Sequence, residues 1–325
     1  MPIDVLFLGG TSIDLIQNKN KRDRPVFLAS TGGSITNSAV MAAKLGLKTA
    51  LISRIGKDPL GDFAVRFLSS CKVNTSGIIQ DSGIRTPIAI ANIDKHGDSR
   101  YTFYKNTSLD SIVCLKDAPK ALLNICKILH LGSSFSFQKH SSIEAMKYVK
   151  YFKKRGVFIS FDPNIRPYTV KDKKPARNRI LRLAKSVDLL KISEVDLKFL
   201  TGQRDPRKGL KKLRKLLSCE IVLTLGPKGS VYYKNRVGYR LQPTRLIKVP
   251  ALKVKVADTI GAGDAYTAGL LYKISKKGMR KVFDNIRPAM TFASSIAALI
   301  CTKSGANQGL KNMKQVNSFI SKQTA

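Results

Sequence analysis

The segment Asp258-Thr-Ile-Gly-Ala-Gly-Asp264 places two carboxylates and three small residues directly before AYTAGLLYKI, an apolar run with helical spacing. The run VKVA before it predicts a strand end, so Gly261, Ala262 and Gly263 should lie where a loop becomes the first turn of a helix. N–H groups in a first turn have no intrahelical partner, and the helix dipole adds partial positive charge. We therefore expect this turn to bind an anion and Asp264 to take a proton from a hydroxyl that attacks a bound phosphoryl group. An isolated GxGD motif would be better explained as a glycine-rich loop with a capping aspartate. Here seven specified residues lie at a junction between a strand and a helix, which favours the anion-binding site.

A second polar segment, Asp162-Pro-Asn164-Ile-Arg166, follows the buried strand pattern VFISF. It is therefore expected at the carboxyl end of a strand, where open α/β sheets place their ligands. The guanidinium of Arg166 can fork onto phosphate oxygens with Asn164 beside it; a structural ion pair is the simpler alternative for this arginine. The chain has no GxxxxGK[ST] loop, and no GxGxxG follows its first strand pattern, which argues against a P-loop kinase or a dinucleotide enzyme.

Composition indicates a globular protein with a large core. The 325 residues are 43% hydrophobic and 24% charged, and no apolar run approaches the roughly 20 residues of a membrane span. Five scattered cysteines without a CxxC pair favour reduced thiols and argue against a disulfide framework or a zinc site. The start, PIDVLFLGG, is typical of a buried strand and not of a signal peptide. We expect a cytoplasmic protein.

The net charge is unusual. Lysine and arginine total 58 against 21 acidic residues, which gives a formal charge of +37. Such a field attracts ATP, anionic sugars, nucleic acid and anionic membrane surfaces without specificity. The basic residues are spread along the chain, with short clusters at 19–24, 171–174 and 211–215, and no aromatic interleaving or helix-turn-helix signature accompanies them. We interpret the excess as a lysine bias on solvated faces, so nucleic acid is not the expected partner.

Strand and helix patterns alternate along most of the chain. Strands are expected at KILHLG, VFISF, LLKIS and IVLTLG, and helices at 141–155, 175–185, near 207–217 and, as the final helix, around 286–300. This order predicts an α/β protein with a Rossmann-like three-layer α/β/α arrangement and a mostly parallel central sheet. Two hairpin patterns, at about 11–30 and about 84–106, predict a small β-sheet lid. We expect one domain over residues 1–325.

These motifs occur in the order seen in the ribokinase-like (PfkB) family of carbohydrate kinases, which the chain resembles nearly end to end. The segment from Gly32 to Asn37 resembles the family's N-terminal signature, and the segment ending at Asp264 resembles its C-terminal signature. The segment Thr224-Leu-Gly226-Pro-Lys-Gly229 resembles its nucleotide loop. The DPNxR segment and Phe103-Tyr104-Lys105 resemble the fructokinase and 2-keto-3-deoxygluconate kinase members most closely.

The resemblance assigns a role to each matching residue. Asp264 would be the catalytic base, and the backbone of Gly261, Ala262 and Gly263 would stabilise transition-state charge. The sugar would be bound by these residues: Asp14, Gly32, Gly33, Asn37, Tyr104 and Arg166. ATP would be bound by these: Asn164, Arg166, Ser193, Thr224, Gly226, Gly229, Gly261 and Gly263.

The chain departs from the family at the segment that helps to place magnesium. Where the family has NxxE, this chain has Ser193-Glu-Val-Asp196, which keeps oxygen donors but shortens their reach. Asp196 is therefore expected to reach Mg²⁺ through water. Magnesium is required because bridging the β- and γ-phosphates neutralises their charge. The family also allows a potassium site beside Asp258.

The sequence thus predicts an ATP-dependent sugar kinase that phosphorylates a hydroxymethyl group, most simply a fructokinase. The alternatives within the family are a 2-keto-3-deoxygluconate kinase and another sugar or nucleoside kinase. The alternative of another class is a non-catalytic, kinase-like protein on nucleic acid, against which the intact Gly-Ala-Gly-Asp argues. Unpaired edges of the lid sheet favour a homodimer formed through the lid.

Overall fold

The computed structural model describes residues 2–17, 26–93, 99–104, 113–124, 126–234 and 246–324. Two features named from the sequence fall outside these ranges: the basic cluster 19–24 and Lys105. Within the described ranges, no helix combines the length and the hydropathy that a membrane span needs.

A nine-stranded sheet forms the centre of the molecule. Its strands lie in the order β13 (Leu246–Val249), β12 (Ser230–Tyr233), β11 (Glu220–Thr224), β10 (Leu189–Ser193), β9 (Phe158–Asp162), β8 (Cys126–Gly132), β1 (Ile3–Leu8), β4 (Thr49–Gly56) and β5 (Val73–Asp81). All neighbours are parallel except the pairs β11–β12 and β12–β13. The predicted mostly parallel α/β sheet is therefore confirmed.

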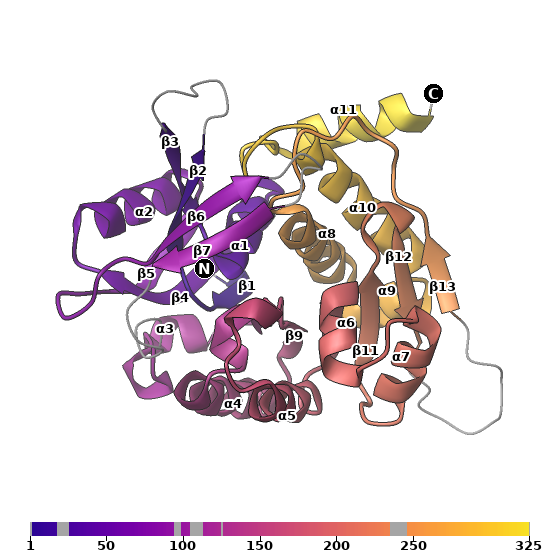
Figure 1. Ribbon diagram of the computed structural model, residues 1–325, viewed down its shortest axis with the longest axis horizontal. Helices are drawn as coiled ribbons and strands as arrows, with labels where there is room; N and C mark the ends of the chain where they lie inside the picture. Colours follow the sequence, from indigo (N-terminus) through magenta and orange to yellow (C-terminus); the bar gives the residue numbers. More distant parts are fainter. Residues whose placement is uncertain are drawn as a thin grey trace.

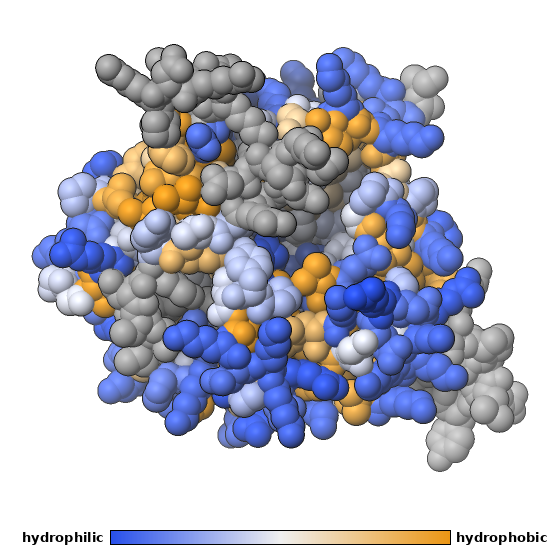
Figure 2. Space-filling view, in the orientation of Figure 1, coloured by the Kyte–Doolittle hydropathy of each residue, from blue (hydrophilic) through white to orange (hydrophobic). Residues whose placement is uncertain are grey.

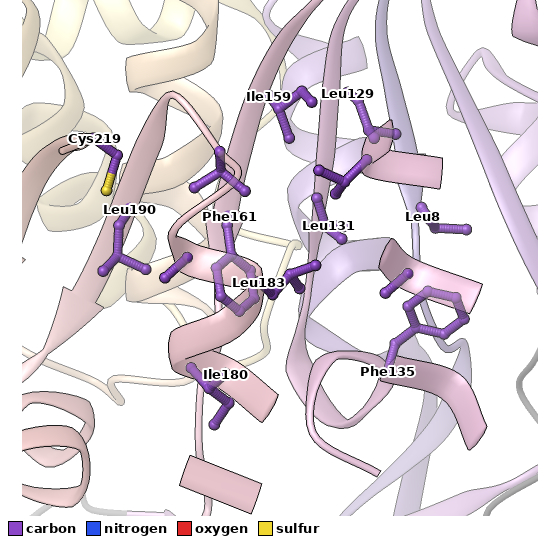
Figure 3. Packing of buried hydrophobic residues seen from close by; sticks show 14 of the residues in the cluster. Leu8, Leu129, Leu131, Phe135, Ile159, Phe161, Ile180, Leu183, Leu190 and Cys219 are labelled. Atoms are coloured by element: carbon purple, nitrogen blue, oxygen red, sulfur yellow. The ribbon is translucent and has the colours of Figure 1, made fainter. Parts of the chain in front are cut away.

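Helices cover both faces of this sheet (Figure 1). One face packs on α1 (Ser34–Lys44), α2 (Pro59–Ser70), α8 (Ala262–Lys277), α9 (Met279–Asp284), α10 (Arg287–Cys301) and α11 (Met313–Thr324); the other packs on α3 (Lys120–Leu123), α4 (Lys139–Lys153), α5 (Lys173–Ala184), α6 (Glu194–Thr201) and α7 (Pro206–Arg214). Alternate strand residues serve the two cores, since Val5 and Phe7 of β1 belong to the α8 side and Leu6 and Leu8 to the α4 side. Figure 3 shows the second core, where Phe161 of β9 packs beside Ile180 and Leu183 of α5.

A separate four-stranded sheet forms the lid, in the order β3 (Phe27–Gly32), β2 (Ser12–Gln17), β6 (Ile88–Ile93) and β7 (Ser99–Tyr104). The two hairpins β2–β3 and β6–β7 are antiparallel and join through a parallel β2–β6 pair, as the sequence predicts. One face of the lid packs Ile13 and Leu15 against α2. On the other face, Ala91 and Ile16 pack against Ile260, which lies just before α8.

Local signals explain where several helices begin and end. Asp58 caps α2 by accepting the N–H of Gly61 at 2.8 Å, with Pro59 in the first turn. Gly46 follows α1 with φ of +91°, as expected of a residue that ends a helix.

Two expectations about secondary structure were wrong. The run VKVA at 254–257 is not a strand: the last strand ends at Val249, before Pro250, and the chain then runs to the end of α10, where the N–H of Ala257 donates to the carbonyl of Cys301. The alternation of apolar residues is typical of a strand, but it does not show whether a neighbouring strand is available for pairing. The apolar helix around 286–300 was expected to be the last, but α11 follows it at Met313–Thr324.

Hydrophilic side chains dominate the outer surface. Figure 2 shows them across the lower half of the visible face, where α4, α5, α6 and α7 lie. Most of the lysine-rich segments in the second half of the chain belong to these helices, including 211–215 at the end of α7.

Candidate active site

Asp264 lies in the first turn of α8 and is only 6% exposed. Two side chains of α1 hold its carboxylate: the Ser34 hydroxyl donates to Oδ1 at 2.6 Å, and the Asn37 amide donates to Oδ2 at 3.1 Å. Burial raises the pKa of Asp264 to about 6, although the bonds from Ser34 and Asn37 and the charge of Lys191 act in the opposite direction. A carboxylate with a pKa this close to neutral is suited to accept a proton and release it again.

The turn before Asp264 has the geometry that the sequence predicts. Gly261 is the N-cap of α8 with φ of +78°, and the helix begins at Ala262. Ala262 donates its N–H to the carbonyl of Thr259 at 3.2 Å, so this N–H is already used in the turn, whereas Gly263 is exposed. Asp258 is fully buried and accepts the N–H groups of Ile260 and Gly305 at 3.0 and 2.9 Å, which fixes the approach of the chain to α8.

Asp14 of the lid strand β2 is the second buried carboxylate of the site. Burial raises its pKa to about 6; a hydrogen bond from Ser12 opposes the shift, and the negative charge of Asp264 adds to it. Gly32 of β3 lies against this carboxylate, and a Cβ on Gly32 would come within 2.1 Å of the Asp14 carboxyl carbon. Glycine is therefore required here by the position of Asp14. Gly33 follows as the N-cap of α1, so the segment from Gly32 to Asn37 connects the lid to the Asp264 turn.

Ser34 is a site residue to which the sequence analysis gave no role. Its Oγ accepts the Asn164 side-chain N–H at 2.6 Å, and its own proton points to Asp264. Because an ionised carboxylate can only accept, the hydroxyl donates its proton to Asp264 while its oxygen accepts from Asn164. Ser34 thus joins the loop after β9 to the predicted base. The position of Ser34 next to Gly33, at the start of a helix, was the one feature of the sequence that could have identified it as a site residue.

Asn307 was also missed. Its amide donates to Oδ1 of Asn37 at 3.2 Å and to the carbonyl of Thr31 at 3.3 Å. The side-chain N–H of Asn37 donates to Asp264, and its amide oxygen accepts from Asn307. Both polar atoms of this amide therefore have protein partners. Its predicted contact with sugar hydroxyls stays a prediction; the structure shows that it positions the base.

The loop after β9 brings Asn164 and Arg166 to the carboxyl edge of the sheet. Asn164 adopts φ of +39°, and its N–H donates to Asp162 at 3.1 Å. Arg166 is exposed, and within the described part of the chain it forms no ion pair. The structural ion pair considered for this arginine is thus absent from the described residues, and the guanidinium faces solvent beside the site loop.

Ser193 and Thr224 end the neighbouring strands β10 and β11 and are paired in register. Thr224 donates its hydroxyl to the carbonyl of Ile192 at 3.2 Å. The short turn from Gly226 to Gly229 follows, with φ of +56° and +92° at these two glycines. Six of the eight residues predicted to bind the nucleotide therefore follow or end β9, β10 and β11 at their carboxyl ends; the other two, Gly261 and Gly263, lie at the start of α8.

Asp196 has a structural task in this arrangement. Its Oδ2 accepts both the N–H and the hydroxyl of Ser193, at 2.7 and 2.6 Å, and its Oδ1 accepts the N–H of Ile165 at 2.7 Å. It is 1% exposed, and burial raises its pKa, with the charge of Asp162 acting in the same direction. Asp196 thus caps α6 and secures the loop that carries Arg166. Its predicted water-mediated contact with magnesium stays a prediction.

Tyr104 does not share the face of the lid that carries Asp14. The register pairs Asp14 with Ala89 and Ala89 with Phe103, so these three side chains lie on one face. Tyr104 pairs with Ile88 on the opposite face and lines a pocket of about 870 Å³ beside α2. The expectation that Tyr104 shares a face with Asp14 is corrected accordingly: Phe103 and Tyr101, which stack on each other, are aromatic residues on the Asp14 side.

A buried carboxylate beside a helix N-terminus, at the carboxyl edge of an α/β sheet that carries a small β lid, defines the ribokinase-like class of fold and site. Residues 3–313 match the pfkB family of carbohydrate kinases, and the chain belongs to this family.

Relatives and solved structures agree with this assignment. The probable chloroplastic fructokinase-6 of Arabidopsis thaliana is 32% identical over 304 residues, which cover 92% of this chain and 77% of that protein. Fructokinase-1 of Zea mays is 29% identical, with 92% and 91% covered. The structure of the fructokinase from Vibrio cholerae O395 with fructose, ADP and calcium ion bound aligns with a TM-score of 0.85 at 29% identity over 98% of both chains. The ATP-bound fructokinase of Xylella fastidiosa, at 23% identity and a TM-score of 0.86 over all of both chains, shares the fold.

Proposed function

We propose that this protein is an ATP-dependent sugar kinase and that fructose is the sugar it prefers. The observation that carries the proposal is Asp264: a buried carboxylate with a raised pKa, held from two sides, in the first turn of a helix whose N-terminus can face a phosphoryl group. Membership of the carbohydrate kinase family and the similarity to fructokinases support it.

The reaction that this geometry supports is an in-line phosphoryl transfer. A sugar hydroxymethyl oxygen attacks the γ-phosphorus of ATP while its proton passes to Asp264. The bond from the γ-phosphorus to the β,γ-bridging oxygen breaks, and ADP leaves with that electron pair. The start of α8 stabilises the charge on the transferring group through its N–H groups and dipole. Asp14, on the lid, is placed to accept hydrogen bonds from other sugar hydroxyls.

The nucleotide is proposed to lie along the carboxyl ends of β9, β10 and β11. Thr224 and the turn Gly226–Gly229 would line its binding site, with Ser193 beside them and Asn164 and Arg166 over the phosphates. The exposed guanidinium of Arg166 is free to bind two phosphate oxygens at once. In this proposal the γ-phosphate would lie between the Arg166 loop and the start of α8.

Magnesium is proposed to arrive with ATP. Among the described residues, no cluster of three or more histidine, cysteine or acidic side chains could hold a metal, and Asp196 already accepts three hydrogen bonds. These residues fit an ion that is held mainly by phosphate oxygens and water, with Asp196 reached through water, which is a common way for proteins to bind Mg²⁺. The ion would neutralise phosphate charge. A potassium requirement beside Asp258 is a further proposal, tested by replacing K⁺ with Na⁺ in the assay.

The identity of the sugar can be tested by a coupled ADP-release assay over fructose, 2-keto-3-deoxygluconate, glucose, ribose and nucleosides. We expect fructose to give the highest kcat/KM, and Asp264→Asn to abolish the turnover. Turnover only with the acid sugar would reassign the substrate within the family. Failure of the wild-type protein to turn over any sugar would contradict the kinase proposal and favour the nucleic-acid alternative, which a salt-dependent gel shift with duplex DNA would then examine.

A homodimer formed through the lid is proposed as well. Strands β3 and β7 are the edges of the lid sheet as described, and each exposes large apolar side chains: Phe27 and Leu28 on β3, Phe103 and Tyr104 on β7. A second lid would cover these edges and side chains. Light scattering coupled to size exclusion should give twice the 35.8 kDa chain mass. A cytoplasmic location is likewise a proposal, supported by five cysteines that are all free thiols.

A further inference from the structure

Lys191 of β10 differs from the other basic residues of this chain. It is 4% exposed, and it is the only fully buried lysine or arginine in the part of the chain that the structure describes. A lysine bias on solvated surfaces accounts for exposed lysines, but it does not account for an ammonium in the core. Removing such a group from water costs several kcal/mol unless it is well paired.

Its first partner is Asp162 of the neighbouring strand. The ammonium donates to Oδ2 of Asp162 at 2.8 Å, and Thr267 of α8 donates to the same oxygen at 3.4 Å. One strand further, His130 contacts Ser160 at 3.0 Å between Nδ1 and Oγ. Burial lowers the pKa of His130 to about 4, so this histidine is neutral and adds no positive charge.

Lys191 also lies directly under the turn that begins α8. A Cβ on Gly263 would lie 3.2 Å from the ammonium nitrogen, closer than nearly all real contacts of a Cβ. The ammonium therefore lies close beside Gly263, at the centre of the proposed anion-binding turn. Gly263 itself is exposed, so a single residue separates the buried cation from whatever binds there.

The ammonium is charged at neutral pH. Burial alone would lower the pKa of Lys191, but the ion pair and hydrogen bond with Asp162 raise it, and the carboxylates of Asp196 and Asp264 add to that effect. The acidic groups around it outnumber it, because Asp162, Asp196 and Asp264 all act on the one cation. Lys191 is thus the single fixed positive charge inside the described part of this acidic cluster.

We propose that Lys191 is a positioning residue of the kinase reaction: its buried ammonium, beneath Gly263, supports the turn of α8 and supplies positive charge to the phosphoryl group that passes over it. The inference rests on the proposed function. The cation does not touch the substrate. It acts through the backbone of Gly263, in a medium where water screens charge weakly, so its field at the phosphoryl group exceeds that of a surface lysine.

The simpler alternative is that Lys191 only neutralises Asp162. The two possibilities differ in what happens when both charges are removed together. In the double variant Lys191→Met/Asp162→Asn, position 162 no longer carries an unpaired buried charge, and the asparagine keeps an oxygen for the N–H of Asn164. A purely structural pair predicts that this variant folds and has the kcat of the wild type.

Our inference predicts that the double variant folds but loses about 10- to 100-fold in kcat, with little change in KM for ATP or sugar. Asp162→Asn alone should lose less, and Lys208→Met, at an exposed lysine of α7, should behave as the wild type. Lys191→Met alone leaves Asp162 unpaired and is expected to be less stable than the double variant.

A binding experiment provides a second readout. Calorimetry with ADP, Mg²⁺, fluoride and aluminium in the presence of the sugar reports affinity for a mimic of the transferring phosphoryl group. We expect the double variant to bind this mixture at least 10-fold more weakly than the wild type and to bind ATP equally well. Wild-type kcat and wild-type affinity for the mimic in a folded double variant would overturn the inference. Absence of any sugar kinase turnover in the wild type is a different result, which contradicts the proposed function itself.

Discussion

The substitution Asp264→Asn should show by how much the buried carboxylate of the proposed base lowers the free energy of unfolding. Burial raises the pKa of Asp264 from 3.8 to about 6. A group whose folded-state pKa is raised holds its proton more tightly in the folded state, so an acid of this kind destabilises the fold as pH rises through that range. Two pKa units correspond to about 3 kcal/mol at pH values above the folded-state pKa. The asparagine does not titrate, so the variant escapes this loss.

The hydrogen bonds from Ser34 and Asn37 complicate a single measurement, because asparagine cannot accept both as the carboxylate does. Their loss costs about 1–3 kcal/mol whatever the pH. The dependence on pH separates the two effects. About half of the 3 kcal/mol is lost between pH 5 and pH 8, so the melting temperature of the variant should rise by roughly 2 °C relative to the wild type over this interval. Relief of Asp14 from the charge of Asp264 acts in the same direction.

The assay is thermal unfolding followed by circular dichroism at pH 5, 6, 7 and 8, with both proteins in the same buffers. Asp172→Asn, at an exposed carboxylate before α5, is the matched control for a single change of aspartate to asparagine. A gap between Asp264→Asn and the wild type that stays constant from pH 5 to pH 8, or that moves against the variant, would refute the reasoning about burial.

Three other changes follow from the site. Ser34→Ala removes the hydrogen-bond donor to Asp264 and the partner of Asn164. We expect kcat to fall about 10-fold and the acidic limb of the pH–rate profile to move to higher pH, because a bond that lowers the pKa of Asp264 is lost. An unchanged acidic limb would show that Ser34 does not act on the base. Gly32→Ala would push the added methyl into Asp14, and KM for the sugar should rise at least 10-fold with stability reduced by about 1–3 kcal/mol, measured by initial rates and melting. Phe103→Ala should raise KM for the sugar more than Tyr104→Ala does, and the reverse order would contradict the lid register.

The layered fold and the turn that carries Asp264 could be predicted because their signals are local. The alternation of strands and helices predicts the parallel sheet, and the lid hairpins follow from period-two runs. The Gly-Ala-Gly turn before Asp264 carries its own helix start. These features depend on neighbours within a few residues of one another in the sequence.

The contacts that complete the site are not local. Ser34 lies 130 residues from Asn164 and 230 from Asp264, so no spacing pattern could identify it as the link between them. Tyr104 was placed on the wrong face because a shift of one residue in strand register exchanges the two faces of a sheet.

Lys191 was hidden for the same reason. In the sequence it is one more lysine, within LLKIS, and its burial depends on the aspartate that the adjacent strand places beside it. A charged residue inside an apolar strand pattern was the available signal. The identity of its partner required the order of the strands.

The difference in surroundings between the internal ammonium of Lys191 and the exposed basic groups determines how this protein should respond to ionic strength. Counter-ions gather around charges in water, and at 0.15 M salt they screen interactions beyond about 8 Å. The excess of basic groups on the outside, which contributes to the net charge of +37, is open to this screening. Lys191 is enclosed by protein and is not. Added potassium chloride should therefore weaken the encounter with anionic ATP, seen as a rising KM, while kcat stays nearly constant. The surface charge of this chain can vary with its surroundings without disturbing the chemistry inside it.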